Sequence, residues 1–520
     1  MILKYVTPLG LIEKKHKLTA IYYTILNLYP WNRTKDENMQ LVLLVKANIF
    51  YKSSQKILTH VTDELKKLED KKVDIKGKSF SVKLFGIAGD NLGSNFIGGF
   101  ICSFRLGSPC CRVCTSEVNV LECYNRYELR DEESFNTCMN NVEADDDLRH
   151  CNGIKMEVPF NNLKEFHSTT SLPPCCAHDL LQGIIRSDFI VYLNYFCKNK
   201  KYFNLDFLNR RIDSFKFKGR DNTVRPSHVE HGKPLNGSAS QIWCFLRFLP
   251  VFLSGKVNEN DEVWQIVLLL RQVCELIFAL SLTEKQVSVM NNKIWEYLHQ
   301  RRQVFPQESF KPKHHFIEHY AYHTLMFGPL LYTCTLRFEA KHQFFKNAIR
   351  SMHNFISVTK ALAEKHELRQ AVLRCANTEL NYPGCLETFN PCSYPQGHLM
   401  LEALKKHSAL NLLCTFHTTS VIEWRGFTYK NGIIVNARIN FVNVYCSISL
   451  IVVAGPRNSD VFVVLRTLET CEVNGVLYIT RKNELTCKKL EELNDPYPLE
   501  LYGSKNDQYI VLKHVSPCFS

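Results

Sequence analysis

The chain has 520 residues, too many for one compact core, and this length predicts two to four domains. Hydrophobic residues make up 45% and charged residues 22%, which excludes a generally disordered protein. Basic residues (64) outnumber acidic ones (51), and the formal charge of +13 suits a polyanionic partner. The 21 cysteines come without an evident secretion signal, so we expect a reducing compartment with thiols as core residues or zinc ligands.

The first part of the chain has the pattern of an α/β layer. Residues 17–47 contain two β-rich runs around a polar stretch, which predicts a hairpin. Residues 53–73 place apolar side chains at spacings of three and four, as in an amphipathic helix. A short apolar strand then ends on Asp90, which Gly89 and Gly93 flank. This carboxylate fits either an ordinary turn or a metal site at the end of a strand.

The middle of the chain is predicted to be mainly helical. Residues 105–325 begin with cysteine-rich loops and continue with helical segments. The longest apolar run, residues 264–282, is interrupted by Arg271 and Glu275. These charges favour a buried helix over a membrane span.

The end of the chain is predicted to be rich in β-strands. Residues 373–415 are rich in Pro, Gly and Cys and predict a linker. From about residue 416 onward, Asn431-Gly432 and Asn474-Gly475 each stand between apolar alternations. Asn-Gly is a strong hairpin signal, so we expect a small antiparallel barrel or sheet.

Residues 336–356 predict a helix that carries a second informative acid. Five apolar side chains share one stripe of this helix: Phe338, Phe345, Ile349, Met352 and Ile356. The stripe predicts a core-facing seam, and Glu339, Lys346 and Arg350 project beside it. A metal-holding acid beside phosphate-neutralising cations has this arrangement, and so does a solvated face with helical ion pairs.

Two groups of residues have the spacing of metal ligands. Cys111 and Cys114 form a single CxxC, for which buried thiols are favoured over a zinc site. His315, His319 and His323 recur at every fourth position and share one helical face. For these histidines, packing and hydrogen bonding are favoured over metal binding.

Six blocks stand in order along the chain from residue 6 to about residue 370: TPLGLIEKKHKLTAIYYTILNL, FGIAGDNLGSNFIGGF, SPCCRVC, FHSTTSLPPCCAHDLLQGI, KPKHHFIEHY and FGPLLYTCTLRFEAKHQFFK. In this order they resemble the transposase of CACTA (EnSpm-type) DNA transposons, in the animal version of the family. The β-rich tail also resembles the C-terminal segment of that family. Several blocks in family order are more specific than any one motif.

The resemblance implies an α/β RNase H-like core with a large, mainly helical insertion and a C-terminal β-rich domain. The implied domains are these: 1–104, the first part of the core with a truncated first strand; 105–325, the insertion; 326–372, the core helix with the final acid; 373–415, the linker; and 416–520, the β-rich domain.

The resemblance also implies a triad of acids that holds two Mg²⁺ or Mn²⁺ ions for phosphoryl transfer to or from DNA. Asp90 matches the second acid and Glu339 the third. The first acid would precede the TPLG block, but the chain has no Asp or Glu before Glu13, so we expect no catalysis from the chain as printed. Cations on the same helix as Glu339 are expected to contact DNA: Lys341, Lys346 and Arg350.

In the family, the CxxC is paired with a downstream histidine, which matches His178. The resemblance therefore implies a structural Zn²⁺ site that includes Cys111, Cys114 and His178, with buried thiols as the alternative.

The resemblance implies a transposon-derived, transposase-like protein in the nucleus, inactive as printed. Its partner is expected to be DNA, without membrane association, and a homo-oligomer is compatible with the family. The alternative is a domesticated nuclear DNA-binding or protein-interaction scaffold without catalysis, or a degenerate copy.

Overall fold

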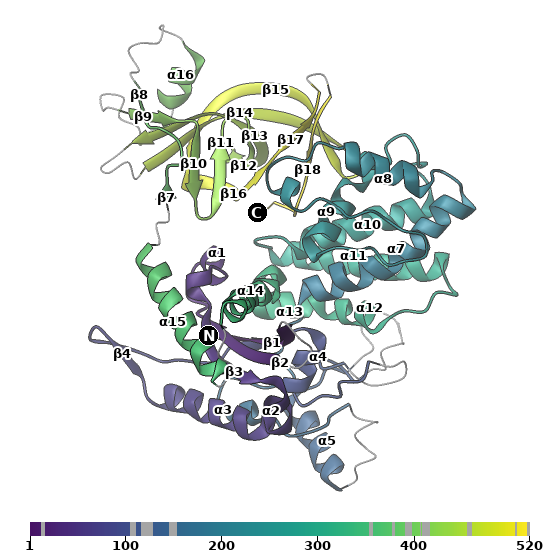
Figure 1. Cartoon of the computed structure of the whole chain (residues 1–520). Coiled ribbons are helices and arrows are strands. Elements are labelled where there is room, and N and C mark those ends of the chain that lie inside the picture. The colour runs from purple at the N-terminus through teal and green to yellow at the C-terminus, as the bar shows by residue number, and fades with distance from the viewer. Residues whose placement is uncertain are drawn as a thin grey trace. The chain divides into compact units, whose positions relative to one another are not determined.

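The computed structural model describes residues 1–11, 16–104, 111–115, 128–144, 153–352, 357–376, 380–389, 398–405, 407, 416–454, 460–504 and 507–516. They form a mixed α/β protein whose last part is a β-rich sheet (Figure 1). The chain divides into two compact units: Met1–Ile185 with Val287–Asn377, and Arg186–Gln286 with Thr378–Ser520. These units cut across the predicted domains, because helices of the predicted insertion group with the C-terminal strands.

The first unit is built on a four-stranded sheet with the order β3-β2-β1-β6. β2 (His16–Thr24) pairs antiparallel with both β1 (Ile2–Leu11) and β3 (Gln40–Lys46). β1 also pairs with β6 (Gly86–Ala88), and this pair is parallel. The predicted hairpin and the strand before Asp90 are confirmed. β1 is an inner strand of this sheet, because it pairs with two neighbours.

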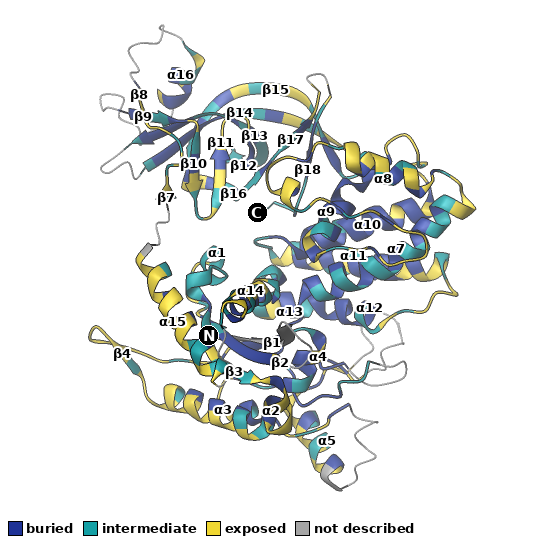
Figure 2. Cartoon of the chain, viewed as in Figure 1, coloured by how far each residue is buried: buried dark blue, intermediate teal, exposed yellow. Residues whose placement is uncertain are grey.

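Helices cover both faces of this sheet. β2 alternates in the usual manner of a strand, so Ile21 points to one face and Ala20 and Tyr22 to the other. On the first face, α2 (Ala47–Lys52) and α3 (Ser54–Asp70) bury apolar side chains against Ile21: Phe50, Leu58, Val61 and Leu65. Figure 2 shows that the outer face of α3 is exposed.

The second face of the sheet is covered by α14 (Leu336–Arg350) and α15 (Val358–Ala376). These helices bury apolar side chains against Leu18, Ala20 and Tyr22: Phe338, Phe345, Ile349 and Leu362. The stripe predicted for residues 336–356 is thus the buried face of α14, although Ile356 lies outside the described residues. α14 also contacts β1, so the helix with Glu339 crosses the strand that pairs with β6.

The remaining elements of the first unit are mostly short: α1 (Pro30–Arg33), η1 (Asp36–Asn38), α2 (Ala47–Lys52), β4 (Val73–Ile75), β5 (Lys78–Phe80), α4 (Asn91–Ile97), α5 (Glu132–Ala144), η2 (Pro159–Asn162), η3 (Ala177–Ile184), α12 (Pro312–Phe316), η6 (Ile317–His319), α13 (Tyr320–Phe327) and η7 (Leu330–Thr333). The long α11 (Glu284–Val304) begins at the boundary between the units.

The second unit contains helices from the predicted insertion: α7 (Ile185–Asn194), η4 (Tyr195–Asn199), α8 (Leu205–Ser214), η5 (Gly219–Thr223), α9 (Ala239–Phe252) and α10 (Glu262–Ile277). The predicted apolar run forms α10, which is buried along most of its length. Arg271 and Glu275 are buried within it and form an ion pair of 2.9 Å, which explains why charges interrupt the run. No helix of the described residues is sufficiently long and apolar to span a bilayer.

The C-terminal strands form an antiparallel sheet with the order β16-β12-β13-β14-β15-β18-β17, in which β9 pairs with β13 and β8 with β9. A smaller sheet has the order β11-β10-β7. The strands are β7 (Leu380–Asn381), β8 (Glu387–Phe389), β9 (Phe416–Thr419), β10 (Val421–Trp424), β11 (Phe427–Lys430), β12 (Ile434–Ile439), β13 (Val442–Ala454), β14 (Asp460–Val473), β15 (Val476–Lys489), β16 (Leu493–Leu499), β17 (Leu501–Gly503) and β18 (Gln508–Val511).

One of the two predicted hairpins is present. β14 and β15 pair around Asn474-Gly475, and both turn residues have positive φ (51° and 75°), as a type I′ turn requires. Asn431-Gly432 instead joins β11 of the small sheet to β12 of the large one, so the hairpin predicted there is wrong. Gly432 still has a positive φ of 83°, but the strands beside it pair with other partners.

The predicted linker also contains regular structure. Its described residues include β8 and α16 (Leu399–Lys405). Both pack against the large sheet, where Phe389, Leu401 and Leu404 share a buried cluster with Phe462. A short 3₁₀ turn, η10 (Leu490–Glu492), joins β15 to β16.

A buried ion cluster joins helices and strands of the second unit. Nη2 of Arg247 lies 2.5 Å from Oδ1 of Asp221, and both side chains are buried. Lys513 Nζ lies 3.4 Å from the same oxygen, and the Tyr502 hydroxyl donates to Oδ2. Burial alone would raise the pKa of Asp221, but Arg247 and Lys513 lower it below its ordinary value of 3.8.

Asp221→Ala is expected to lower the free energy of unfolding of this unit by about 3–5 kcal/mol, because buried cations lose their carboxylate. Urea denaturation measures the change. Since the native pKa of Asp221 is lowered, its contribution is present above pH 3.8 and is lost as the pH falls further. The control is Asp213→Ala, which removes an exposed pair with His228 and should cost less than about 1 kcal/mol. Equal effects of the two variants would contradict this role of Asp221.

Candidate metal centre and acid site

Two cysteines and two histidines meet inside the first unit: Cys111, Cys114, His315 and His319. Cys111 Sγ lies 3.4 Å from His319 Nε2, and Cys114 Sγ lies 3.3 Å from His315 Nε2. The two Nε2 atoms are 3.2 Å apart, and all four candidate ligand atoms lie within 4.8 Å of one another. All four side chains are buried. This buried Cys2His2 group can hold a metal ion, and two thiolates with two imidazoles are a donor set that suits tetrahedral zinc.

Local structure explains how each pair of ligands is presented. Arg130 Nε donates to the carbonyl oxygens of both Cys111 and Cys114, at 3.0 Å each, and so fixes the CxxC turn. His315 lies in α12 and His319 in the turn η6 that follows it, so their spacing of four residues puts them on one face. The sequence favoured packing and hydrogen bonding for these two histidines, whereas in the structure their side chains contact the cysteines.

The electrostatics of the group lower the pKa of the Cys111 thiol and raise that of the His315 imidazole to about 10. A metal would therefore find a thiolate but would displace a proton from His315. Burial alone would raise the pKa of the Cys111 thiol, but Cys114 and the two imidazoles lower it well below its ordinary value. Metals bind the thiolate, so this shift favours binding. Nδ1 of His315 lies 3.3 Å from Glu318 Oε2. A carboxylate behind a metal-binding imidazole orients the ring and strengthens the ligand.

The structure does not bring His178 to Cys111 and Cys114, although the resemblance assigned it to that centre. Its Nδ1 lies 3.0 Å from Sγ of Cys175, and its Nε2 lies 3.6 Å from Oε1 of Glu339. The spacing of His315 and His319 was the available sequence signal for the ligands that the structure places there. Nothing local in the sequence linked that pair to cysteines about 200 residues away.

The third histidine of the series, His323, is not a member of the Cys2His2 group. It is buried one turn further along, in α13. Burial and the neighbouring Arg112 and His319 lower its pKa well below the ordinary value, so it is neutral. The packing role predicted for His323 therefore agrees with its buried position in α13.

Asp90 is separated from the end of β6 by Gly89 alone and is the N-cap residue of α4. Its Oδ1 accepts a hydrogen bond of 2.7 Å from the backbone of Gly93, so the carboxylate caps this helix. β6 runs parallel to β1 and ends at Ala88, so Asp90 lies just beyond the carboxyl end of this strand. Of the two alternatives from the sequence, the local backbone role is present as this helix cap, and metal binding by Asp90 stays a prediction.

Glu339 lies in the first turn of α14, where its Oε1 accepts a hydrogen bond of 2.8 Å from Thr335. The same oxygen lies 3.6 Å from His178 Nε2. Burial alone would lower the pKa of His178, but Cys175, Glu339 and Asp90 raise it to about 9. His178 is therefore protonated at neutral pH, and the charges of both predicted acids act on it.

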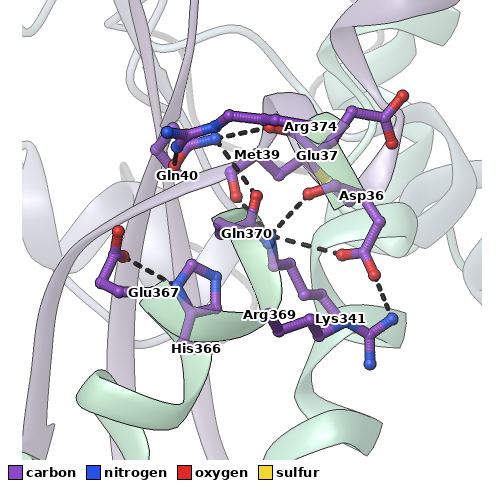
Figure 3. Close-up of polar contacts among 10 residues, drawn as sticks. All are labelled: Asp36, Glu37, Met39, Gln40, Lys341, His366, Glu367, Arg369, Gln370 and Arg374. Atoms are coloured by element: carbon purple, nitrogen blue, oxygen red, sulfur yellow. Dashed lines mark hydrogen bonds and ion pairs between the residues drawn. The ribbon is translucent and has the colours of Figure 1, made fainter. Parts of the chain in front are cut away.

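Lys341 has surroundings that differ from those expected of a DNA contact. Its side chain is buried, and Nζ donates to the carbonyl oxygens of Asp36 (2.8 Å) and Met39 (Figure 3). Nζ also lies 3.3 Å from Asp36 Oδ1. Burial lowers the pKa of Lys341 to about 8. Lys341 therefore fastens α14 to the connection between β2 and β3, while Lys346 is partly exposed and Arg350 is exposed.

A buried network of polar side chains, the Arg112 network, joins the metal centre to the acid site. Arg112 Nη1 donates to the side-chain oxygens of Asn91 (3.1 Å) and Asn95 (3.2 Å), both in α4. Asn91 donates to Oδ1 of Asp179, and the hydroxyl of Tyr320 donates to Oδ2 at 2.9 Å. All five side chains are buried or nearly so.

The members of the Arg112 network are sequence neighbours of the site residues. Arg112 stands between the two cysteines, and Tyr320 follows His319. Asn91 follows Asp90, and Asp179 follows His178. The Arg112 network thus connects the chain segments that carry the Cys2His2 group to those that carry Asp90 and His178.

Comparison with models of known protein families gives no match for this chain. A search of curated proteins gives no match either. Neither result bears on the resemblance to CACTA transposases, so function is inferred from the geometry described above.

The purified chain is expected to contain about one zinc ion per molecule, held by four protein ligands. Cys114→Ser and His319→Ala should reduce the zinc content to near zero, because each removes a ligand. His178→Ala and Cys471→Ser, an exposed cysteine of the other unit, should retain it. Atomic emission after dialysis measures the ratio. Zinc that is lost in His178→Ala but kept in His319→Ala would contradict this ligand set.

Arg112→Met is expected to lower the free energy of unfolding by roughly 1–3 kcal/mol for each buried acceptor that it leaves without a donor. Amide exchange of α4 should accelerate, and hydrogen–deuterium exchange followed by mass spectrometry measures it. Arg350→Met, at an exposed position on α14, is the control. Unchanged exchange of residues 91–97 in Arg112→Met would show that the network does not hold this helix.

Proposed function

We propose that this chain is a DNA-binding protein related to the DDE transposases of CACTA (EnSpm-type) transposons, with an RNase H-like core. Such a core begins with three antiparallel strands and a fourth strand parallel to the first. The sheet order β3-β2-β1-β6 and the helices on both of its faces support this proposal.

The observation that carries the proposal is the contact of 3.6 Å between Glu339 and His178, an imidazole whose pKa the charge of Asp90 also raises. Asp90 and Glu339 lie about 250 positions apart, yet both carboxylates act on one imidazole. In the proposed site, Asp90 and Glu339 would hold Mg²⁺ or Mn²⁺, which activates a water or a 3′-hydroxyl for phosphoryl transfer. Asp90 supplies a carboxylate fixed by its helix cap, and Glu339 supplies one oriented by Thr335.

Two carboxylates give such a cation few protein ligands. We therefore propose weak binding of the divalent ion and no strand cleavage by residues 1–520 alone. The Cys2His2 group is proposed to hold zinc in a structural role, because a centre with four protein ligands leaves no open position for a substrate.

DNA is proposed as the partner and the nucleus as the compartment. The net charge of +13 favours a polyanion, and Lys346 and Arg350 on α14 are accessible cations near the acid site. A homo-oligomer is compatible with this proposal.

A non-catalytic DNA-binding or protein-interaction scaffold is the second candidate function. The contact between His178 and Glu339 favours it, because a protonated imidazole already neutralises the acid that a divalent ion would need. In this candidate the acid pair stabilises the fold, and the Cys2His2 group and the exposed surface carry the function.

Residues 1–520 are expected to bind duplex DNA with an affinity that falls as salt rises. The double variant Lys346→Ala/Arg350→Ala should reduce the slope of log K against log salt by about 2, since two phosphate contacts are lost. Fluorescence anisotropy at several salt concentrations measures this slope. Lys56→Ala/Lys66→Ala, with two exposed lysines of α3, is the control. Absence of DNA binding would contradict the proposal.

Incubation of the chain with Mg²⁺ or Mn²⁺ and supercoiled DNA is expected to give no nicks. Nicking that Glu339→Gln abolishes would overturn the proposed lack of cleavage. Mn²⁺ binding, followed by electron paramagnetic resonance, should weaken in Glu339→Gln and in Asp90→Asn. Asn is a good helix cap, so Asp90→Asn removes the charge but keeps the cap. Equal Mn²⁺ binding in all forms would favour the scaffold.

A further inference from the structure

A stacked pair of aromatic side chains, Tyr29 and Trp31, lies on the connection between β2 and β3. The ring centroids are 4.8 Å apart, and the planes differ by 6°. Tyr29 is 63% exposed, which is unusual for a ring of this size. The pair therefore presents an aromatic surface to solvent. We call these two side chains the aromatic pair.

The backbone under the aromatic pair is held in place by Arg33. Its Nε donates to the carbonyl of Leu28 at 2.9 Å, and its Nη2 donates to that of Leu26 at 2.7 Å. The hydroxyl of Thr24 donates to the carbonyl of Arg33 at 2.8 Å. A surface that is already ordered loses little entropy when a ligand binds.

The same connection is fixed to the part of the chain that carries Glu339. The guanidinium carbon of Arg33 lies 5.9 Å from the ring centroid of Tyr332, in the turn η7 before α14. Seven residues after Tyr29, Asp36 contacts Lys341 of α14 (Figure 3). The connection is thus bound to this region at two points, and the aromatic pair has a defined position relative to the acid site.

Two exposed arginines of α15 border this connection. Arg369 Nη2 contacts Oδ2 of Asp36, and Arg374 Nη2 donates to Oε1 of Gln40 at 2.6 Å (Figure 3). Both side chains extend from α15 toward the β2–β3 connection. The connection that carries the aromatic pair is thus also contacted by a guanidinium group at Asp36, and the adjoining strand is contacted likewise at Gln40. An exposed aromatic ring offers stacking for a base, and nearby cations attract the phosphates of a strand.

We propose that the aromatic pair binds an unpaired base of a DNA strand, which stacks on the exposed ring of Tyr29. Arg369 and Arg374 attract phosphates of the same strand. A base inside a duplex is already stacked on its neighbours, so the site selects a single strand, an end or an extruded base. This inference rests on the proposed function and extends it, because it names the form of DNA that the core receives near Glu339.

Binding of a fluorescein-labelled 12-nucleotide single strand and of the matching duplex, followed by anisotropy, tests the inference. Tyr29→Ala should weaken single-strand binding about 5- to 150-fold, as expected for the loss of one stacked base, and should change duplex binding little. Tyr29→Phe should retain binding, because it keeps the ring. Tyr51→Ala, an exposed tyrosine of α2, is the matched control and should bind as the unmodified chain does.

The outcomes separate this inference from the proposed function. If the unmodified chain binds duplex DNA but Tyr29→Ala binds single strands equally well, the aromatic pair is not a base site and only this inference fails. If the chain binds neither form of DNA, both fail. If Arg369→Ala/Arg374→Ala weakens single-strand binding while Tyr29→Ala does not, binding is electrostatic only, and base stacking is overturned. Equal unfolding temperatures of the variants show that the differences concern binding.

Discussion

The first unit depends on the burial of one guanidinium group. Arg112 is almost inaccessible to water, and a buried cation is costly unless polar partners surround it. Its donors reach Asn91 and Asn95 in α4, and Nε reaches the carbonyl of Leu172. The CxxC turn, the helix that Asp90 caps and the segment before η3 must therefore assemble together. Because Asp179 and Tyr320 complete the network, this constraint extends to both histidines of the metal centre.

Sequence patterns predicted the elements whose structure is determined by residues close together in the sequence. The periodicity of α3 and α14, the apolar strand before Asp90 and the turn at Asn474-Gly475 each follow from neighbouring residues. The turn at Asn431-Gly432 shows what such local patterns do not predict. Asn-Gly permits the backbone conformation of a tight turn, but it does not determine which strands pair with each other. The grouping of the middle helices with the C-terminal strands likewise depends on long-range packing. Buried charges such as Arg247 and Asp221 carry no periodic signal that would reveal this grouping.

The candidate site was only partly predictable, for a related reason. Asp90 and Glu339 were identified by resemblance, and each lies where a strand or helix begins or ends. The pairing of His315 and His319 with the cysteines depends on contacts across about 200 residues. Lys341 was expected on the surface because its charge is visible in the sequence, whereas the carbonyl groups of Asp36 and Met39 that receive it are not. His178 was assigned to Cys111 and Cys114 by resemblance, whereas the structure places it beside Cys175 and Glu339.

The Cys2His2 group also closes a long loop of the chain, because its two pairs of ligands lie far apart in the sequence. Cys114 and His315 meet at this centre although they lie 201 positions apart, and the chain between them includes parts of the first unit as well as helices of the second. The entropic cost of closing such a loop grows only with the logarithm of its length. A metal bound here would therefore close a loop of about 200 residues at an entropic cost little larger than that of closing a much shorter loop.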